Sequence, residues 1–134
     1  MSVFRSLDIA ASGARMSRTW LDAIAHNIAN VNTVRPPDEE PFRAKLVVAK
    51  AVEGADGAGD GVAVVGIQEA PGEPALVYDP THPYADEDGY VRRPVVDLAG
   101  QMADLMAAQR SYQANLSVVR SSREAYEAAL RIGR

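Results

Sequence analysis

The sequence predicts an α+β protein, mainly α, with long N- and C-terminal helices and a small antiparallel β module between them. Near both ends of the chain, large or apolar residues recur at alternating spacings of three and four, the periodicity of a coiled-coil seam. Between these regions lie prolines, a glycine-rich tract and short runs rich in valine, which are typical of turns and strands. The three segments are residues 1–33, 34–94 and 95–134.

The first segment predicts a helix that begins after Ser2, a suitable N-cap, and ends near Ala29 or Asn30, where polar residues follow. Its middle is rich in small residues, which permit close approach of another backbone, whereas its second half is bulky. A single row of residues at heptad spacing defines its seam. That row is Val3, Leu7, Ala10, Ala14, Ser17, Leu21, Ile24 and Ile28.

The middle segment predicts a stiff connector followed by short strands. Prolines in residues 35–41 exclude helix there because they remove amide donors and bias the preceding residue to extended geometry. Residues 42–52 and 61–67 read as two strands of a hairpin whose flexible tip is the glycine-rich run 54–61. Residues 76–78 and 89–92 predict two further strands. A module this thin buries little surface, so we expect it to pack on the helices.

The last segment predicts a helix from the N-cap Asp97 to about Ile132, a rod of roughly 50 Å. Glu127 and Arg131 are spaced to form an ion pair. Two polar residues, Gln109 and Arg123, occupy seam positions, where such residues can fix register. The full seam is Leu98, Met102, Leu105, Gln109, Tyr112, Leu116, Val119, Arg123, Tyr126 and Leu130.

Composition narrows the classes of partner. The net charge of −4 over 134 residues argues against a nucleic-acid surface, and no run approaches the ~18 apolar residues of a membrane span. We therefore expect neither nucleic-acid binding nor direct membrane insertion. Arg5, Asp8 and Arg15 interrupt any signal-peptide core, so an exported chain would keep its N-terminus. The chain contains no cysteine.

No motif predicts a catalytic, metal or cofactor site, and we expect no enzyme. His26 and His82 lack the convergent ligands of a zinc site. The run Asp86–Gly89 resembles part of a calcium loop, but the loop positions that need acidic ligands would hold Tyr84 and Val95. The glycine-rich run 54–61 precedes a strand rather than the helix that a phosphate loop requires.

Several motifs, taken together and in their order along the chain, resemble those of bacterial flagellar rod and hook proteins. Residues 27–33, Asn-Ile-Ala-Asn-Val-Asn-Thr, resemble the motif that follows the N-terminal helix of that family. Residues 111–115, Ser-Tyr-Gln-Ala-Asn, resemble its C-terminal signature. Residues 78–83, 89–94 and 128–134 resemble its short proximal-rod subunits. Residues 32–35 lack the glycine-aromatic turn of longer family members, which also favours a proximal-rod subunit.

The resemblance implies a structural rod subunit whose two terminal helices pair as a coiled coil and pack with neighbours into a helical tube that transmits motor torque. It implies contacts with copies of itself and with other rod subunits of the FlgB, FlgF and FlgG types. It also implies export by the flagellar type III apparatus and a place in the periplasmic part of the basal body. The assembly interface would comprise both seams, Asn30, Asn32 and Asn115. The alternative is a soluble coiled-coil adaptor or export chaperone.

Overall fold

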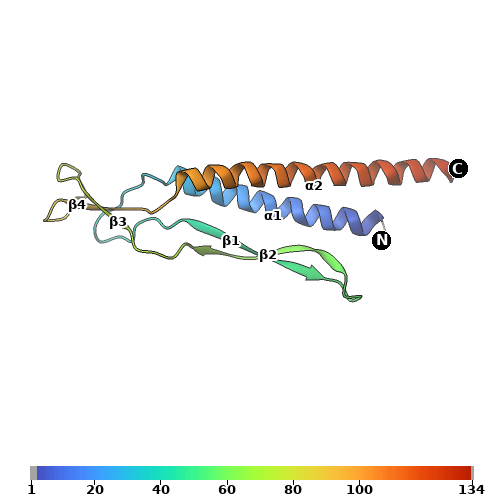
Figure 1. Ribbon diagram of the computed structural model, residues 1–134, viewed down its shortest axis with the longest axis horizontal. Coiled ribbons are helices and arrows are strands. Elements are labelled where there is room, and N and C mark those ends of the chain that lie inside the picture. Colours follow the sequence, from blue (N-terminus) through green and yellow to red (C-terminus); the bar gives the residue numbers. More distant parts are fainter. Residues whose placement is uncertain (1–2, 134) are drawn as a thin grey trace.

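The computed structural model describes residues 3–133 and confirms the predicted α+β architecture. Figure 1 shows three layers along most of the molecule: one long helix, a shorter helix in the middle, and a β-hairpin on the other side. A second hairpin projects beyond the end of these layers. In chain order the elements are α1 (Val3–Ala29), β1 (Lys45–Glu53), β2 (Gly59–Glu69), β3 (Ala75–Tyr78), β4 (Tyr90–Arg93) and α2 (Leu98–Ile132).

Both helices have the predicted bounds. Asp97 occupies the N-cap position of α2 with extended backbone angles, although its side chain makes no capping hydrogen bond. The proposed cap Ser2 lies outside the described residues, as does the side chain of Val3. The predicted first strand starts too early, because Phe42 and Ala44 are buried in an irregular segment and pairing begins at Lys45.

The four strands form two separate antiparallel sheets, β1–β2 and β3–β4. The β1–β2 hairpin packs along α1, as expected for a module that relies on a helix. The β3–β4 hairpin does not pack on a helix. Among the described elements, β3 contacts only β4, and β4 contacts only β3. The expectation that the whole module packs on the helices is therefore wrong for its second half.

The two helices run antiparallel, and the predicted pairing between them is confirmed. Asn27 contacts Gln101 near one end of α1, and Phe4 stacks edge-on against Tyr126 near the other, with ring centroids 5.1 Å apart. α2 therefore extends beyond the start of α1, as Figure 1 shows. Its 35 residues give a rod of about 52 Å.

Asn27 joins three elements at one point. Its side-chain amide oxygen accepts the amide hydrogen of Lys45 at 2.7 Å, and its nitrogen donates to the Lys45 carbonyl at 2.9 Å. The same nitrogen donates to Gln101 Oε1 at 2.8 Å. Asn27 thus completes the backbone bonding of the first residue of β1 and links it to α2. The side chain is fully buried, so each of these bonds replaces one to water.

Two contacts hold the rest of the β1–β2 hairpin against α1. Ser12 Oγ accepts the amide hydrogen of Val62 at 3.0 Å and donates to the carbonyl of Ile9. Gly61 adopts a φ of +120°, and a Cβ there would lie 2.4 Å from Ser12 Oγ. Only glycine suits both the backbone angle and this close approach.

An ion-pair cluster anchors the hairpin tip at the N-terminal end of α1. Arg5 pairs with Asp56 at 2.6 Å and lies 3.3 Å from Asp60. Its guanidinium also donates to the carbonyls of Ala58 and Gly59. The hydrogen bond from Arg5 lowers the pKa of Asp56 from 3.8 to about 2, with help from the Ala58 amide.

Replacing Asn27 by alanine should destabilise the fold strongly. The change leaves the half-buried polar groups of Lys45 and Gln101 without their partner, at a cost of ~1–3 kcal/mol in the free energy of unfolding. Urea denaturation followed by circular dichroism measures this. The matched control Asn32→Ala removes an exposed amide and should change stability by less than ~0.5 kcal/mol. Equal denaturation midpoints for the two variants would refute the role of Asn27.

The tip anchor should depend on pH in a defined direction. Because the folded pKa of Asp56 is lower than its ordinary value, the Arg5 contact stabilises the docked tip above about pH 4 and is lost as pH falls towards 2. A carboxyl ¹³C NMR titration should give a midpoint near 2 in the native chain and a higher midpoint in Arg5→Gln, which stays below 3.8 because the Ala58 amide still donates to Asp56. Unchanged titration of Asp56 in the variant would show that Arg5 does not hold it.

Candidate assembly surface

Small and polar residues form the middle of the surface between α1 and α2, and the Phe4–Tyr126 aromatic pair lies near its end. Ser17 and Ser111 share a hydrogen bond at 3.0 Å, and Ala108 is completely buried. A Cβ added to Gly13 would lie 2.7 Å from Asn115 Oδ1. Small side chains bring the two backbones close together, so this contact is dense but buries little apolar area.

On α2 this contact lies one residue earlier than the seam that the apolar periodicity predicts. The residues facing α1 are Gln101, Ala108, Ser111 and Asn115, whereas the predicted series places Met102, Gln109, Tyr112 and Leu116 next to them. One residue is about 100° around a helix. Met102 and Gln109 therefore lie beside the intramolecular contact rather than within it, whereas Tyr126 contacts Phe4 of α1.

The predicted seam residues of α1 are mostly shielded from solvent. Ala10, Ala14 and Ile24 are buried, and Leu7, Leu21 and Ile28 are half-buried. Asn30 ends the helix by donating to the carbonyl of His26 at 2.8 Å. Asn32 is exposed in the turn that follows.

The predicted interface residues of α2 are divided between half-buried and exposed positions. Leu105, Tyr112, Asn115, Leu116 and Val119 are half-buried, whereas the exposed members are Leu98, Met102, Gln109, Arg123, Tyr126 and Leu130. Arg123 pairs with Glu127 at 2.8 Å, so the predicted pairing of Glu127 with Arg131 is not the one formed.

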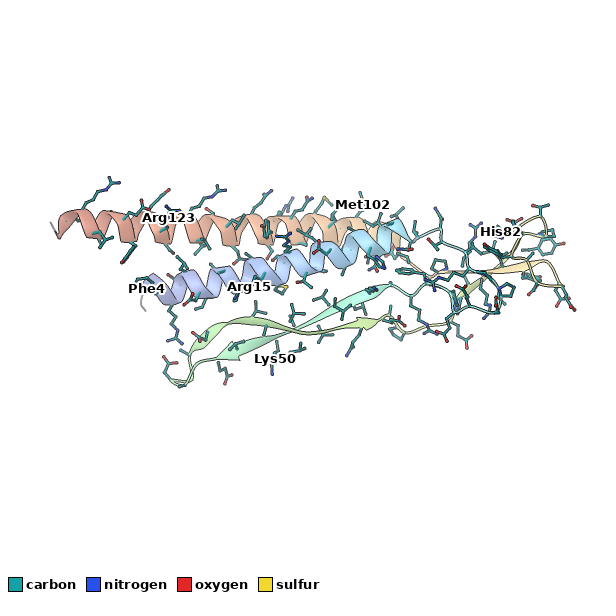
Figure 2. The ribbon with its side chains drawn as sticks, turned by 180° about the vertical axis from the view of Figure 1, so that it is seen from behind. Phe4, Arg15, Lys50, His82, Met102 and Arg123 are labelled. Carbon is teal, nitrogen blue, oxygen red and sulfur yellow. The ribbon has the colours of Figure 1, made fainter. Side chains whose placement is uncertain are left out.

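An apolar stripe runs along α2 away from α1. We call Leu98, Met102 and Met106 the outer stripe; they are 46%, 49% and 55% exposed. The residues recur every four positions and so share one side of the helix. Figure 2 shows Met102 on the side of α2 remote from α1. Two further apolar side chains, Leu130 at 56% and Ile132 at 86%, are exposed separately near the C-terminal end of α2.

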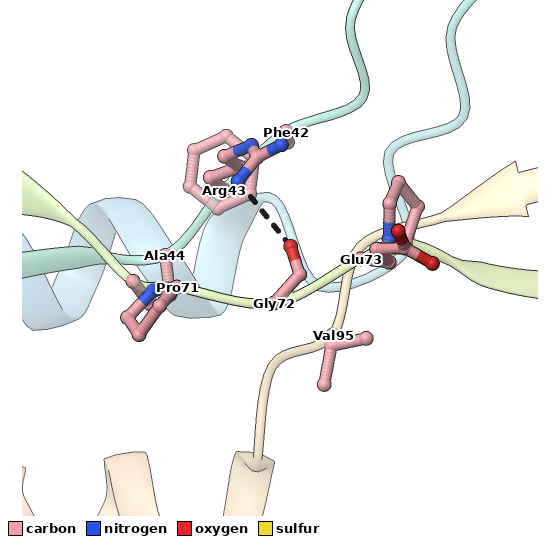
Figure 3. Close-up of a pocket in the computed structure, with 9 residues that line it drawn as sticks. Phe42, Arg43, Ala44, Pro71, Gly72, Glu73 and Val95 are labelled. Atoms are coloured by element: carbon pink, nitrogen blue, oxygen red, sulfur yellow. Dashed lines mark hydrogen bonds between the residues drawn. The ribbon is translucent and has the colours of Figure 1, made fainter.

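Other candidate sites are small or lack convergent groups. Within residues 3–133, no three histidine or acidic side chains gather where they could hold a metal ion. Neither described helix combines the length and apolarity needed to cross a bilayer. Residues 42–44 and 70–74 meet Val95 around a cavity of about 20 Å³, room for one water molecule, and Arg43 donates there to the carbonyl of Gly72 (Figure 3).

The two histidines have structural surroundings. The His26 ring lies 5.4 Å from the ring of Phe42, and His82 Nδ1 accepts the amide hydrogen of Tyr84 in a turn. Asp86 accepts the amide hydrogens of Asp88 and Tyr90, which forms the acidic turn before β4.

The sequence patterns did not indicate the polar residues that join α1 to the β1–β2 hairpin and to α2. Asn27 lies inside the motif of residues 27–33 but outside the apolar series, and Ser12 and Arg5 belong to neither. The available signal was the concentration of Ser, Gly and Asn on one side of α1, which indicates close packing rather than solvent exposure.

Comparison with known proteins agrees with this architecture. Residues 7–36 match the family model described as flagella basal body rod protein, and residues 87–132 match the C-terminal model of the flagellar basal body rod FlgEFG proteins. The chain is 38% identical over 133 residues to the flagellar basal-body rod protein FlgC of Salmonella typhimurium, covering 99% of each.

Two further relatives give similar values. Identity to the flagellar basal-body rod protein FlgC of Bacillus subtilis is 34% over 150 residues, covering all of both chains. Identity to the FlgC protein of Aquifex aeolicus is 39% over 128 residues, covering 95% of this chain and 94% of that one. With two terminal helices and full-length similarity to these relatives, the chain belongs to the FlgC family of flagellar basal-body rod proteins.

Proposed function

We propose that this chain is a non-catalytic structural subunit of the proximal rod, and that its terminal helices supply the contacts between subunits. The observation that supports this most directly is the placement of apolar residues on α2. Its small, polar side faces α1, while the outer stripe and the C-terminal end remain open. A helix that needed only α1 as a partner would place its large apolar residues against α1.

The proposed mechanical role follows from helix geometry. A rod that transmits torque must resist twisting, and long helices whose side chains interlock with those of neighbouring helices provide that stiffness. Identical subunits that contact one another through two different surfaces build a helical array rather than a closed dimer. The open surface of α2 is suited to one such contact, and the predicted interface residues on α1 and α2 remain candidates for the others.

Partners and location form part of the same proposal. The neighbours would be copies of this chain and rod subunits of the FlgB, FlgF and FlgG types, in the periplasmic part of the basal body. Export through the flagellar type III apparatus belongs to this proposal as the route that a flagellar rod subunit would take. The adaptor alternative explains the helices but not the family membership.

Placing a charge on the outer stripe should block assembly without unfolding the subunit. Met102→Asp puts a carboxylate where the proposal buries apolar surface, and desolvating that charge is costly. Because Met102 is half exposed in the free subunit, circular dichroism should be unchanged. We expect the amount of the variant in purified basal bodies to fall at least about tenfold, since ~1.4 kcal/mol suffices for that factor, and cells to lose motility.

The control Ser121→Asp adds the same charge at an exposed position of α2 that lies on neither the α1 contact nor the outer stripe. It should assemble and swim like the native chain. Normal motility and normal incorporation of Met102→Asp would contradict the proposed use of α2.

A further inference from the structure

The β3–β4 hairpin carries large side chains on the side of its sheet that faces water. Tyr78 pairs directly with Tyr90, and Leu76 pairs with Arg92, so these four side chains share one face of the sheet. We call them the tyrosine face. Leu76 is 67% exposed, Tyr78 64% and Tyr90 41%, and Arg92 is also exposed.

The opposite face of the same hairpin is the one that packs within the chain. Val91 is fully buried there, and Val77 is half-buried. The hairpin projects beyond the end of the three layers (Figure 1), and no other described helix or strand contacts it. The tyrosine face is therefore supported from behind and left without a partner among the described elements.

The two tyrosine rings have fixed positions in the free chain. Their centroids lie 5.3 Å apart in an edge-to-face arrangement. Gly89 is buried beside them with a φ of +82°, and a Cβ there would lie only 3.0 Å from the ring of Tyr78. Asp86 accepts the amide hydrogen of Tyr90 at 2.8 Å and donates its own to the Tyr90 carbonyl. Rigid aromatic side chains lose little entropy on binding and often dominate the energy of protein interfaces.

The surroundings of these rings are negatively charged. Residues 73–90 contain five acidic side chains and no lysine or arginine. Glu87 and Asp88 are exposed in the turn directly before Tyr90, and within residues 3–133 neither takes part in an ion pair. Their carboxylates are therefore available to a cation from outside the chain.

The two arginines of β4 do not neutralise these carboxylates. Arg92 belongs to the tyrosine face, but its guanidinium donates to the carbonyl of Pro37 in the connector. Arg93 lies on the opposite face, with Val91. The end of the hairpin thus combines unpaired carboxylates with exposed tyrosine rings, and both kinds of group attract a guanidinium or an ammonium.

We infer that the tyrosine face binds a surface of a neighbouring rod protein that carries an arginine or a lysine. The aliphatic part of that surface lies on Leu76, its cation lies over the ring of Tyr78, and Glu87 and Asp88 supply the attracting charge. The inference rests on the proposed function and adds to it, because it assigns the projecting hairpin to contacts between proteins and specifies the charge of the partner.

Photocrosslinking in intact basal bodies tests this contact. A benzophenone amino acid replaces Leu76 at the edge of the tyrosine face, and in the matched control it replaces Ala75, an exposed neighbour on the opposite face. After irradiation, the products are identified by mass spectrometry. We expect position 76 to link to one protein, and position 75 to give at least about fivefold less of that product, because successive side chains of a strand point to opposite faces.

Substitutions in the labelled chain then test the chemistry, with the yield measured per incorporated subunit. Tyr78→Leu removes the ring and should lower the yield about threefold, whereas Tyr78→Phe keeps a ring and should leave it unchanged. Glu87→Lys combined with Asp88→Lys should lower the yield at least about tenfold, and Glu53→Lys on the other hairpin should not change it. Since no helix contacts β3 or β4, the circular dichroism of the Tyr78, Glu87 and Asp88 variants should match that of the native chain.

The partner provides the last measurement. Replacing the lysine or arginine beside its linked residue by glutamine should reproduce the loss seen with Tyr78→Leu. If position 76 links to lipid or to no protein, or if the yield is the same in Tyr78→Leu and in the charge-reversed chain, the inference is wrong and the proposed function stands. If the native chain is itself absent from basal bodies, the proposed function fails and the inference fails with it.

Discussion

The buried side chain of Asn27 is the constraint on which the rest of the structure depends. A peptide-like side chain at the end of α1 bonds to both backbone groups of Lys45 and to Gln101 of α2. The first residue of the hairpin and the first turn of α2 are thereby fixed relative to the same point on α1. Ser12 and Arg5 then continue the attachment of the hairpin along α1, so that the three layers have one register. A buried amide with all three partners in place specifies that register better than apolar contact would.

The polar contact between α1 and α2 explains how a small subunit can be folded and still expose apolar side chains. Hydrogen bonds and close packing of Ser, Gly and Ala join α1 to α2, which leaves Leu98, Met102 and Met106 exposed on the free subunit. In the isolated chain, apolar surface is therefore exposed on α2 and on the β1–β2 hairpin. Burying that surface between subunits recovers roughly 25 cal/mol per Å², so assembly supplies stability that the free subunit lacks.

Periodicity and turn residues were sufficient to predict the two helices, the order of the strands and the pairing of the first two. The resemblance of residues 27–33 and 111–115 added the family and the pairing of the helices. The contact register of α2 could not be predicted, because heptad periodicity follows large residues, whereas close approach of the helices selects Ala108, Ser111 and Asn115. The separation of β3–β4 from the helices was missed for a related reason. Short strands carry no signal that distinguishes a packed hairpin from a projecting one, and that choice is made by tertiary contacts alone.

The central claim is that the polar side of α2 holds the subunit together while its apolar side joins subunits. Oxidative footprinting of methionines measures this directly, because Met102 and Met106 belong to the outer stripe and sulfoxide formation reports their access to solvent. With dilute peroxide, both should oxidise readily in the free chain and at least about tenfold more slowly in intact basal bodies, since a buried thioether is shielded. Equal oxidation rates in the two states would show that the outer stripe stays open to water in the rod and would contradict the account.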